Sequence, residues 1–570
     1  MLRVVLRARL AASVVFPCLL LASCGEGNGP GTPSTDCGGA SVQTVPVGQF
    51  SVVDPLDRGS CVRFPAAGAA GAEHLYVALA TAGDETSSGL ESPYQLSGNA
   101  PATASRHRVT APRLRAFAGP ADGPARRFHT SLRKRERALS SNPSVLSARR
   151  GAVHGPSFSS APPVPPAVGT KDTFNVCQTV DCNDYVKSVA TAQVVTPRVA
   201  IFLDDSVPPN GYTLSDLQQV GTLFDDYLYP IDTTAFGRES DLDSNGVVIV
   251  LLTQRVNELT PNCTDGSVIL GYFFGLDLVP AADSAHSNKG EFFYGLVPDP
   301  TNTGCSISKE YATRNLSPVF IHEFQHMISF NQHVLIRKSA SEDTWLNEGL
   351  SHFAEELGGR KIPDALCANN DCLTQFAAGN LDNAYNYLRD PEASYLIEPG
   401  NSSGTLEERG ANWLFVRWLA DHFDTDSLGA NLTKSLLGTT RIGAANIEAV
   451  TRQSFPTLVG EWQLANYLDN LPGFTPGNDL LQYPSWNFRA VFASFNQQLP
   501  AFFPEKYPLI PDTVTSAAYI RAGTLRAGSG PFVLVRQDPS AGSVDLTLTN
   551  GAGQPPAAAV APRIAVVRIR

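Results

Sequence analysis

The segment 322–326 constrains the fold of this chain more than any other. His322 and His326 lie four residues apart, so on an α-helix their imidazoles share one face and can converge on a single ion. Glu323 lies at the edge of that face, within reach of a water molecule held by such an ion. Polar side chains inside an apolar helix are costly without partners, and a metal ion removes that cost. The pattern therefore predicts a metal-binding helix.

The residues around this segment predict that the helix is buried. Ser317 is a good N-cap and Pro318 suits the first helical position, so we expect the helix to begin there. The residues that follow are nearly all apolar: Val319, Phe320, Ile321, Phe324, Met327, Ile328 and Phe330.

A second segment, 345–352, offers Glu348 as a third ligand. Glu348 lies 22 residues after His326 and near the start of another apolar helix. A catalytic zinc ion takes three protein ligands and keeps a fourth position open for water. We therefore expect His322, His326 and Glu348 to bind zinc, with Glu323 as the general base.

The two segments together resemble a known group of enzymes. H-E-x-x-H followed by N-E-x-x-S is similar to the gluzincin metallopeptidases, and the wording HEFQHMISFN with WLNEGLSHFAEEL is most similar to the hyicolysin family of bacterial secreted zinc peptidases. The resemblance implies a zincin-like fold, peptide-bond hydrolysis, and the same ligands and base. His352 falls where thermolysin-like enzymes have an aspartate that orients a ligating histidine.

The resemblance also bears on the residue that stabilises the oxyanion of the reaction. Related enzymes use a tyrosine or histidine downstream of the third ligand, and we expect Tyr395 in this role, with Tyr385, Tyr387 and Arg409 as alternatives.

The reaction is expected to be endopeptidase cleavage of proteins or peptides. The aminopeptidases of the clan bind the free amine through G-x-M-E-N, and the chain's two methionines, Met1 and Met327, allow no such segment. Two alternatives stay open. One is exopeptidase action, and the other is a surface lipoprotein that uses a zincin-like body for adhesion or scaffolding without catalysis.

The N-terminus predicts export. Three arginines precede an apolar run from 10 to 21, and Leu21-Ala22-Ser23-Cys24 is typical of a lipobox. We expect a signal peptide at 1–23, lipidation of Cys24 and a flexible tether at 24–36, which would anchor the protein at the outer membrane, facing the periplasm or the surface. An ordinary secretory signal is the alternative. No other run is long enough to span a bilayer, so membrane contact is expected only through the lipid.

Eight further cysteines form an even set, which in an exported protein indicates disulfides. We expect nearest-neighbour pairing, namely Cys37 with Cys61, Cys177 with Cys182, Cys263 with Cys305, and Cys367 with Cys372.

The rest of the chain is typical of an α+β protein with several domains. Short strand patterns predict a small β domain at 37–100 and another at 511–570, on either side of a zincin-like domain at 171–510 with a mixed sheet and a helical C-terminal part. Within this domain we expect strands at 199–203 and 247–252 and a helix at 214–228. The stretch 291–297 is expected to be a strand, either pairing with extended substrate or lying in the core.

The segment 101–170 is basic at first and then rich in proline and serine. Residues 101–150 contain twelve lysines and arginines against Asp122 and Glu136. The segment is a linker, a pro-segment cut at 126–127 or 149–150, or a basic arm on anionic surfaces. The charges are not interleaved with a series of stacking aromatic residues as nucleic-acid binding would require, so no nucleic-acid partner is expected.

Asp241, Asp243 and Asn245 are candidates for a second metal site. These residues match the opening of a calcium loop, but the twelfth position is Leu252 where such loops have glutamate. A turn held by these side chains is therefore favoured over Ca²⁺.

Overall fold

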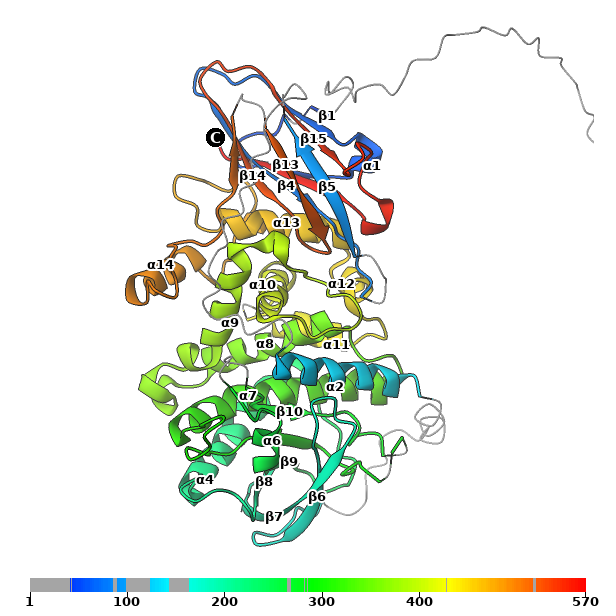
Figure 1. The fold of residues 1–570 in the computed structure, drawn as a ribbon, viewed down its shortest axis with the longest axis vertical. Coiled ribbons are helices and arrows are strands. Elements are labelled where there is room, and N and C mark those ends of the chain that lie inside the picture. The colour runs from blue at the N-terminus through cyan, green and yellow to red at the C-terminus, as the bar shows by residue number, and fades with distance from the viewer. Residues whose placement is uncertain are drawn as a thin grey trace, which may run out of the picture.

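The computed structural model describes residues 41–42, 44–85, 90–98, 123–142, 163–263, 268–280, 282–283, 285–426, 428–515 and 519–570. The predicted signal peptide, Cys24 and the tether lie outside these residues. Within them the protein has three tiers: strands at one end, helices in the middle and a second sheet at the other end (Figure 1). The predicted α+β class is confirmed.

The six-stranded sheet carries the strands expected ahead of the metal helix. Its order is β10-β11-β9-β8-β7-β6, and β8, β9 and β11 run parallel. The strands are β6 (Lys171–Cys177), β7 (Tyr185–Val195), β8 (Val199–Asp204), β9 (Val248–Leu252), β10 (Gly271–Phe273) and β11 (Phe292–Gly295).

The edge strand beside the metal helix is β10, and not the predicted stretch 291–297; the other edge strand is β6. That stretch contains β11, which pairs with β9 on one side and with β10 on the other. Both sides of its backbone are therefore occupied, and it is the core strand of the two alternatives. A strand added to this edge would pair with β10.

The metal helix α7 (Lys309–Phe330) begins earlier than the sequence predicts. Its N-cap is Ser308, whose hydroxyl accepts from the N–H of Tyr311, so Pro318 lies inside the helix. A proline has no N–H to donate to the carbonyl four residues before it. Here that carbonyl, on Arg314, accepts from the side chain of Gln375 at 3.0 Å, which compensates for the missing bond.

The helix expected at 214–228 is longer than predicted. A capping box between Thr213 and Asp216 starts α4 (Leu214–Leu223), and the helix continues through a π-helical turn (Phe224–Leu228) into α5 (Tyr229–Phe236). A shorter helix, α6 (Gln254–Glu258), follows β9.

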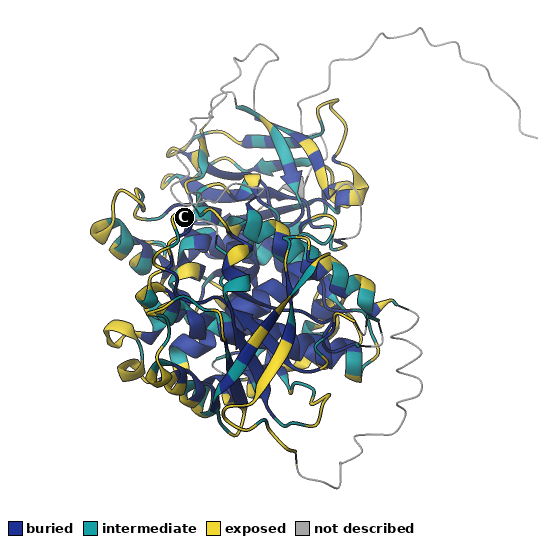
Figure 2. Ribbon diagram, turned by 60° about the horizontal axis from the view of Figure 1, so that its bottom comes forward, coloured by how far each residue is buried: buried dark blue, intermediate teal, exposed yellow. Residues whose placement is uncertain are grey.

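The middle tier is helical, as expected after residue 356. Glycine allows close packing there, since a Cβ at Gly349 of α8 would lie 2.8 Å from the carbonyl oxygen of Asn412 on α10. The helices are α8 (Thr344–Lys361), α9 (Cys372–Arg389), α10 (Leu406–Phe423), α11 (Ala430–Leu437), α12 (Gly443–Thr451), α13 (Phe455–Leu468) and α14 (Phe488–Gln498). Figure 2 shows that burial extends through this tier.

The strands of the two terminal segments form two shared five-stranded sheets, which we call the terminal sandwich. One sheet has the order β1-β3-β15-β5-β13 and the other β12-β14-β4-β16-β2. The N-terminal elements are β1 (Ser41–Val42), β2 (Phe50–Val53), α1 (Pro55–Arg58), β3 (Cys61–Phe64), β4 (Ala72–Leu79) and β5 (Glu91–Ser97). The C-terminal strands are β12 (Asp512–Val514), β13 (Ile520–Arg526), β14 (Phe532–Gln537), β15 (Val544–Thr549) and β16 (Arg563–Arg568).

Part of the basic segment is a helix, α2 (Pro124–Ser140). Phe128 and Leu132 are fully buried, and they join the core that covers one face of the six-stranded sheet. In Figure 1, α2 lies between this sheet and the middle tier. This part of the segment is therefore packed against the body of the protein.

Three of the expected disulfides are present, and these pairings are confirmed: Cys177–Cys182, Cys263–Cys305 and Cys367–Cys372. Cys61 is also disulfide-bonded, and its expected partner Cys37 lies outside the described residues. In the part of the chain that the structure describes, no helix has the length and apolarity to cross a membrane.

The terminal sandwich leads to a prediction about its two halves. Residues 24–122 and 123–570, produced as separate chains, should co-purify, because β4 lies between β14 and β16 and is buried along its whole length. Co-elution from an affinity column measures this. Val535→Asp, which places a charge at a fully buried position of β14, should weaken the association. Independent elution of the unaltered pair would contradict the prediction.

Candidate metal centre

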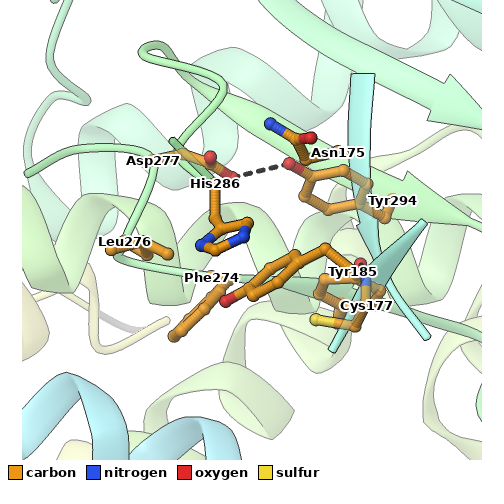
Figure 3. Close-up of a pocket in the computed structure, with 9 residues that line it drawn as sticks. Asn175, Cys177, Tyr185, Phe274, Leu276, Asp277, His286 and Tyr294 are labelled. Carbon is orange, nitrogen blue, oxygen red and sulfur yellow. Dashed lines mark hydrogen bonds between the residues drawn. The ribbon is translucent and has the colours of Figure 1, made fainter. Parts of the chain in front are cut away.

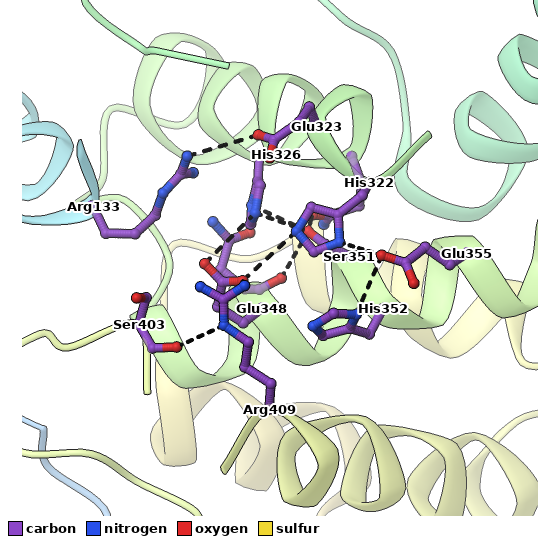
Figure 4. A network of polar contacts seen from close by, with 12 residues as sticks. Arg133, His322, Glu323, His326, Glu348, Ser351, His352, Glu355, Ser403 and Arg409 are labelled. Carbon is purple, nitrogen blue, oxygen red and sulfur yellow. Dashed lines mark hydrogen bonds and ion pairs between the residues drawn. The ribbon is translucent and has the colours of Figure 1, made fainter. Parts of the chain in front are cut away.

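Two neighbouring helices bring the predicted ligands together (Figure 4). His322 and His326 come from α7, and Glu348 comes from α8. Nε2 of His322 lies 3.7 Å from Oε2 of Glu348, and Nε2 of His326 lies 3.8 Å from Oε1. Two ligands of one tetrahedral zinc ion lie roughly 3.3–3.4 Å apart, given bonds of about 2.0–2.1 Å. The three side chains are therefore close to the spacing that one ion requires.

The carboxylate of Glu348 is buried and receives no hydrogen bond. Neither oxygen has a hydrogen-bond partner among the described residues, and its charged neighbours are Arg409 at 3.6 Å and the imidazoles at 3.7 and 3.8 Å. A buried carboxylate without close hydrogen bonds is costly. A divalent cation between this group and the two imidazoles would satisfy it, so the residues fit a metal ion. Two histidines and one glutamate are a donor set typical of catalytic zinc.

The electrostatics of these groups favour a bound cation. Burial by itself would raise the pKa of Glu348, but Arg409 and the two histidines outweigh it and hold that pKa well below its usual range. Burial likewise disfavours charge on His322, yet Glu348 and Glu355 outweigh it and raise the pKa of His322 to about 10. The carboxylates thus attract positive charge to the place where the imidazoles meet.

Glu355 orients the first histidine. Its Oε1 lies 2.7 Å from Nδ1 of His322, which leaves Nε2 directed at Glu348. Although burial opposes ionisation, His352 and His322 lower the pKa of Glu355 to about 2, so the group is a carboxylate at neutral pH. A carboxylate on the far nitrogen fixes the tautomer and strengthens an imidazole ligand.

His352, which the sequence predicted for that orienting role, does not hold it in the structure. Its Nδ1 lies 3.2 Å from Oε1 of Glu355, and its ring packs against that of His322 with centroids 4.8 Å apart. Sequence reasoning missed Glu355, although a signal existed. Glu355 follows Glu348 by seven residues, which on a helix is two turns along the same face.

The second histidine is oriented by Ser351. The hydroxyl of Ser351 lies 3.1 Å from Nδ1 of His326 and 3.3 Å from Nε2, and it donates to the side-chain oxygen of Gln325. Because the oxygen is almost equally far from both ring nitrogens, it packs against the imidazole and limits how the ring of His326 can turn.

Glu323 is held beside the ligands and not among them. Its Oε2 accepts from the backbone N–H of Phe273 on β10 at 2.9 Å, and Nη2 of Arg133 lies 3.9 Å away. The side chain is buried, and burial raises its pKa even though His322 and Arg133 oppose the shift. A raised pKa suits a group that must take and release a proton near neutral pH.

Of the four residues considered for stabilising the oxyanion, the structure brings Arg409 to the centre. Its Nη1 lies 3.6 Å from Oε2 of Glu348, and its Nε donates to the carbonyl of Ser403. The hydroxyl of Tyr395 instead donates to Glu91 on β5 at 2.8 Å. Tyr385 and Tyr387 bond to Glu505 and Gln463. The hydroxyl of Tyr395 is therefore bonded elsewhere, because the loop that carries Tyr395 packs on the terminal sandwich.

In the candidate calcium loop at 241–247, side chains accept hydrogen bonds from backbone N–H groups of the same loop. Asp241 accepts from the N–H of Gly246, Asp243 from Asn245, and Asn245 from Val247. These bonds form the predicted side-chain-held turn. The carboxylates of Asp241 and Asp243 also approach that of Glu291, which already accepts from Ser240 and Leu242.

A small pocket lies on the face of the six-stranded sheet that is opposite to α7 (Figure 3). The rings of Tyr185 and His286 stack with centroids 4.5 Å apart, and Tyr294 donates to Asp277 at 2.6 Å. Its lining includes Tyr272, the neighbour of Phe273 in β10, so it opens away from α7. Burial raises the pKa of Asp277 to about 7, and its hydrogen bonds from Tyr294 and Asn288 only partly offset this.

Comparison with known proteins finds a metalloprotease. The chain is 29% identical over 197 residues to the neutral metalloprotease ShpI of Staphylococcus hyicus. The match covers 34% of this chain and 42% of the length of that protein. No family model matches the chain.

The orientation of His322 by Glu355 predicts a change in metal affinity. Glu355→Gln should weaken zinc binding about 10–100-fold, because the amide cannot stabilise the ligating tautomer as a carboxylate does. Competition with a fluorescent chelator measures the affinity.

Glu310→Gln is the matched control, since it removes an exposed carboxylate from the first turn of α7. Equal zinc affinity in the two variants would show that Glu355 has no part in holding the ligand.

Proposed function

We propose that this protein is an exported zinc-dependent metallopeptidase that cleaves within polypeptides. The observation that carries the proposal is the meeting of His322 and His326 at the buried carboxylate of Glu348, which receives no hydrogen bond, with Glu323 beside them. The similarity to a neutral metalloprotease supports the same activity.

The ligands of the ion would be the two Nε2 atoms and the carboxylate of Glu348. A zinc ion held in this way supplies a Lewis acid that activates water and polarises the carbonyl of the peptide bond. Glu323 takes the proton from the attacking water and passes it to the leaving amine, as a general base and then a general acid. Glu355 and Ser351 keep the imidazoles in place through the cycle.

The substrates are proteins or peptides, and endopeptidase cleavage is proposed because the chain has no methionine with which to build G-x-M-E-N. Export is supported by the lipobox at 21–24 and by three disulfides, which persist in oxidising compartments. The anchor is the lipid on Cys24 at the outer membrane, and neither nucleic acid nor a further membrane contact is part of the proposal.

Glu323→Gln tests the proposed base. The variant should keep its zinc and its fold but lose at least about a hundredfold in kcat on casein, because the amide cannot take a proton. Cleavage is followed by mass spectrometry of the fragments, with and without a chelator. Internal fragments support endopeptidase action. Unchanged cleavage by Glu323→Gln would contradict the mechanism, and absence of cleavage by the zinc-loaded wild type and by every zinc-loaded variant of α2 would favour the scaffolding alternative.

His326→Ala tests the ligand set. The variant should lose zinc, because only one imidazole and one carboxylate remain to hold the ion. Elemental analysis of the purified protein gives the zinc content, and circular dichroism shows whether the helices are intact. Full zinc occupancy in this variant would place the metal elsewhere.

A further inference from the structure

Helix α2 reaches from the basic segment into the candidate metal centre. Arg133, which is buried, donates from Nη2 to the carbonyl of Phe273 at 3.3 Å, and the same nitrogen lies 3.9 Å from the carboxylate of Glu323. Figure 4 shows this guanidinium directed at Glu323 from the side opposite His322. An arginine of α2 therefore faces the proposed general base.

The same helix covers the free edge of the six-stranded sheet. Both backbone groups of Phe273 point away from β11, since the N–H donates to Glu323 and the carbonyl accepts from Arg133. Just beyond β10, the N–H of Gly275 donates to Glu136 of α2 at 2.8 Å. Backbone groups at a sheet edge are those that an extended peptide would pair with. Helix α2 holds two of these groups, the carbonyl of Phe273 and the N–H of Gly275, while Glu323 of α7 holds the N–H of Phe273.

Contacts hold α2 across the gap between the sheet and the middle tier. On the sheet side, the rings of Phe128 and Tyr272 meet edge to face with centroids 4.9 Å apart. On the side of α10, the hydroxyls of Thr130 and Ser403 lie 2.9 Å apart. At its C-terminal end, Arg137 donates to the carbonyl of Ser341 at 2.7 Å. The helix thus bridges the two parts that border the metal centre.

The charge of α2 matches its surroundings. Arg133 pairs with Glu136 of the same helix at 3.0 Å and faces Glu323 at 3.9 Å, and Glu85 and Asp343 are both paired to Arg137. Buried ion pairs between two elements hold them in register only while both partners are in place. The basic run at 124–140 is therefore complementary to the region around the centre, which explains charges that the proposed reaction does not use.

We propose that α2 is an internal inhibitory segment that occupies the substrate-binding edge and pairs with Glu323. The inference rests on the proposed function, because it assigns the regulation of that same centre. Displacement or excision of α2 opens the edge of β10 and frees the base. Strands β1–β5 pair with C-terminal strands, so a single cut at 149–150 would leave the N-terminal part bound through the terminal sandwich.

The test compares casein hydrolysis by the zinc-loaded full chain with that of three variants. Arg133→Ala removes the group that faces Glu323, Phe128→Ala removes the apolar anchor, and the double variant removes both. Lys134→Ala is the matched control, since it removes the same charge from an exposed neighbour on the same helix. Zinc content and melting temperature are measured for each protein.

Arg133→Ala and Phe128→Ala should each raise hydrolysis about tenfold or more, because each destabilises the occluded state by at least the equivalent free energy. Lys134→Ala should not change it. A synthetic peptide of residues 123–142 should inhibit the double variant, and the same peptide carrying Arg133→Glu should not. If Phe128→Ala does not fold, Arg133→Ala and the peptide on that variant decide the result.

Two results would overturn the inference while leaving the proposed function intact. Loss of hydrolysis in Arg133→Ala, with zinc and fold retained, would mean that Arg133 serves the reaction. Equal hydrolysis by wild type and all variants, with no inhibition by the peptide, would mean that α2 is an inert part of the body. Failure of the proposed function gives a different result, in which neither wild type nor any zinc-loaded variant cleaves casein.

Discussion

The structure of this protein depends on a buried carboxylate that faces two buried imidazoles. Glu348 and the two histidines come from different helices, and their burial is costly unless they and Arg409 lie together. The close contact of α8 with α10 at Gly349 keeps the preceding residue, Glu348, in position. The hydrogen bond between His322 and Glu355 then leaves Nε2 of His322 on the side of Glu348, and Ser351 packs against the ring of His326. The packing of α7, α8 and α10 therefore also sets the arrangement of the candidate ligands.

The six-stranded sheet and the helices hold different side chains of the metal centre in place. The helices supply the ligands, while the edge strand β10 supplies a backbone N–H that fixes Glu323. Because Glu323 is held by the sheet and not by the ligand helices alone, the base and the backbone edge keep one fixed relation. A peptide bound at that edge would lie next to the base, which is what cleavage within an extended chain requires.

Helix α2 gives the basic segment a structural meaning. Arg133 and Arg137 face carboxylates of the body, so part of the positive charge at 101–150 is complemented within the protein and not only solvated at its surface. The terminal sandwich adds to this picture, since it ties the strands before α2 to the C-terminal strands. The chain therefore runs from the terminal sandwich to the metal centre at α2, and its last strands return to the same sandwich.

The sequence by itself determined the elements that depend on local pattern. The spacing of His322 and His326, the strands at 199–203 and 247–252, the long helices and the nearest-neighbour disulfides follow from periodicity and proximity along the chain. Only the tertiary structure decided which residues meet from distant segments. Glu355 rather than His352 reaches His322, β10 rather than β11 is the edge, and Tyr395 turns to Glu91. These contacts depend on how helices rotate and how strands order themselves, which is set by packing over the whole core and leaves little trace in any one stretch of sequence.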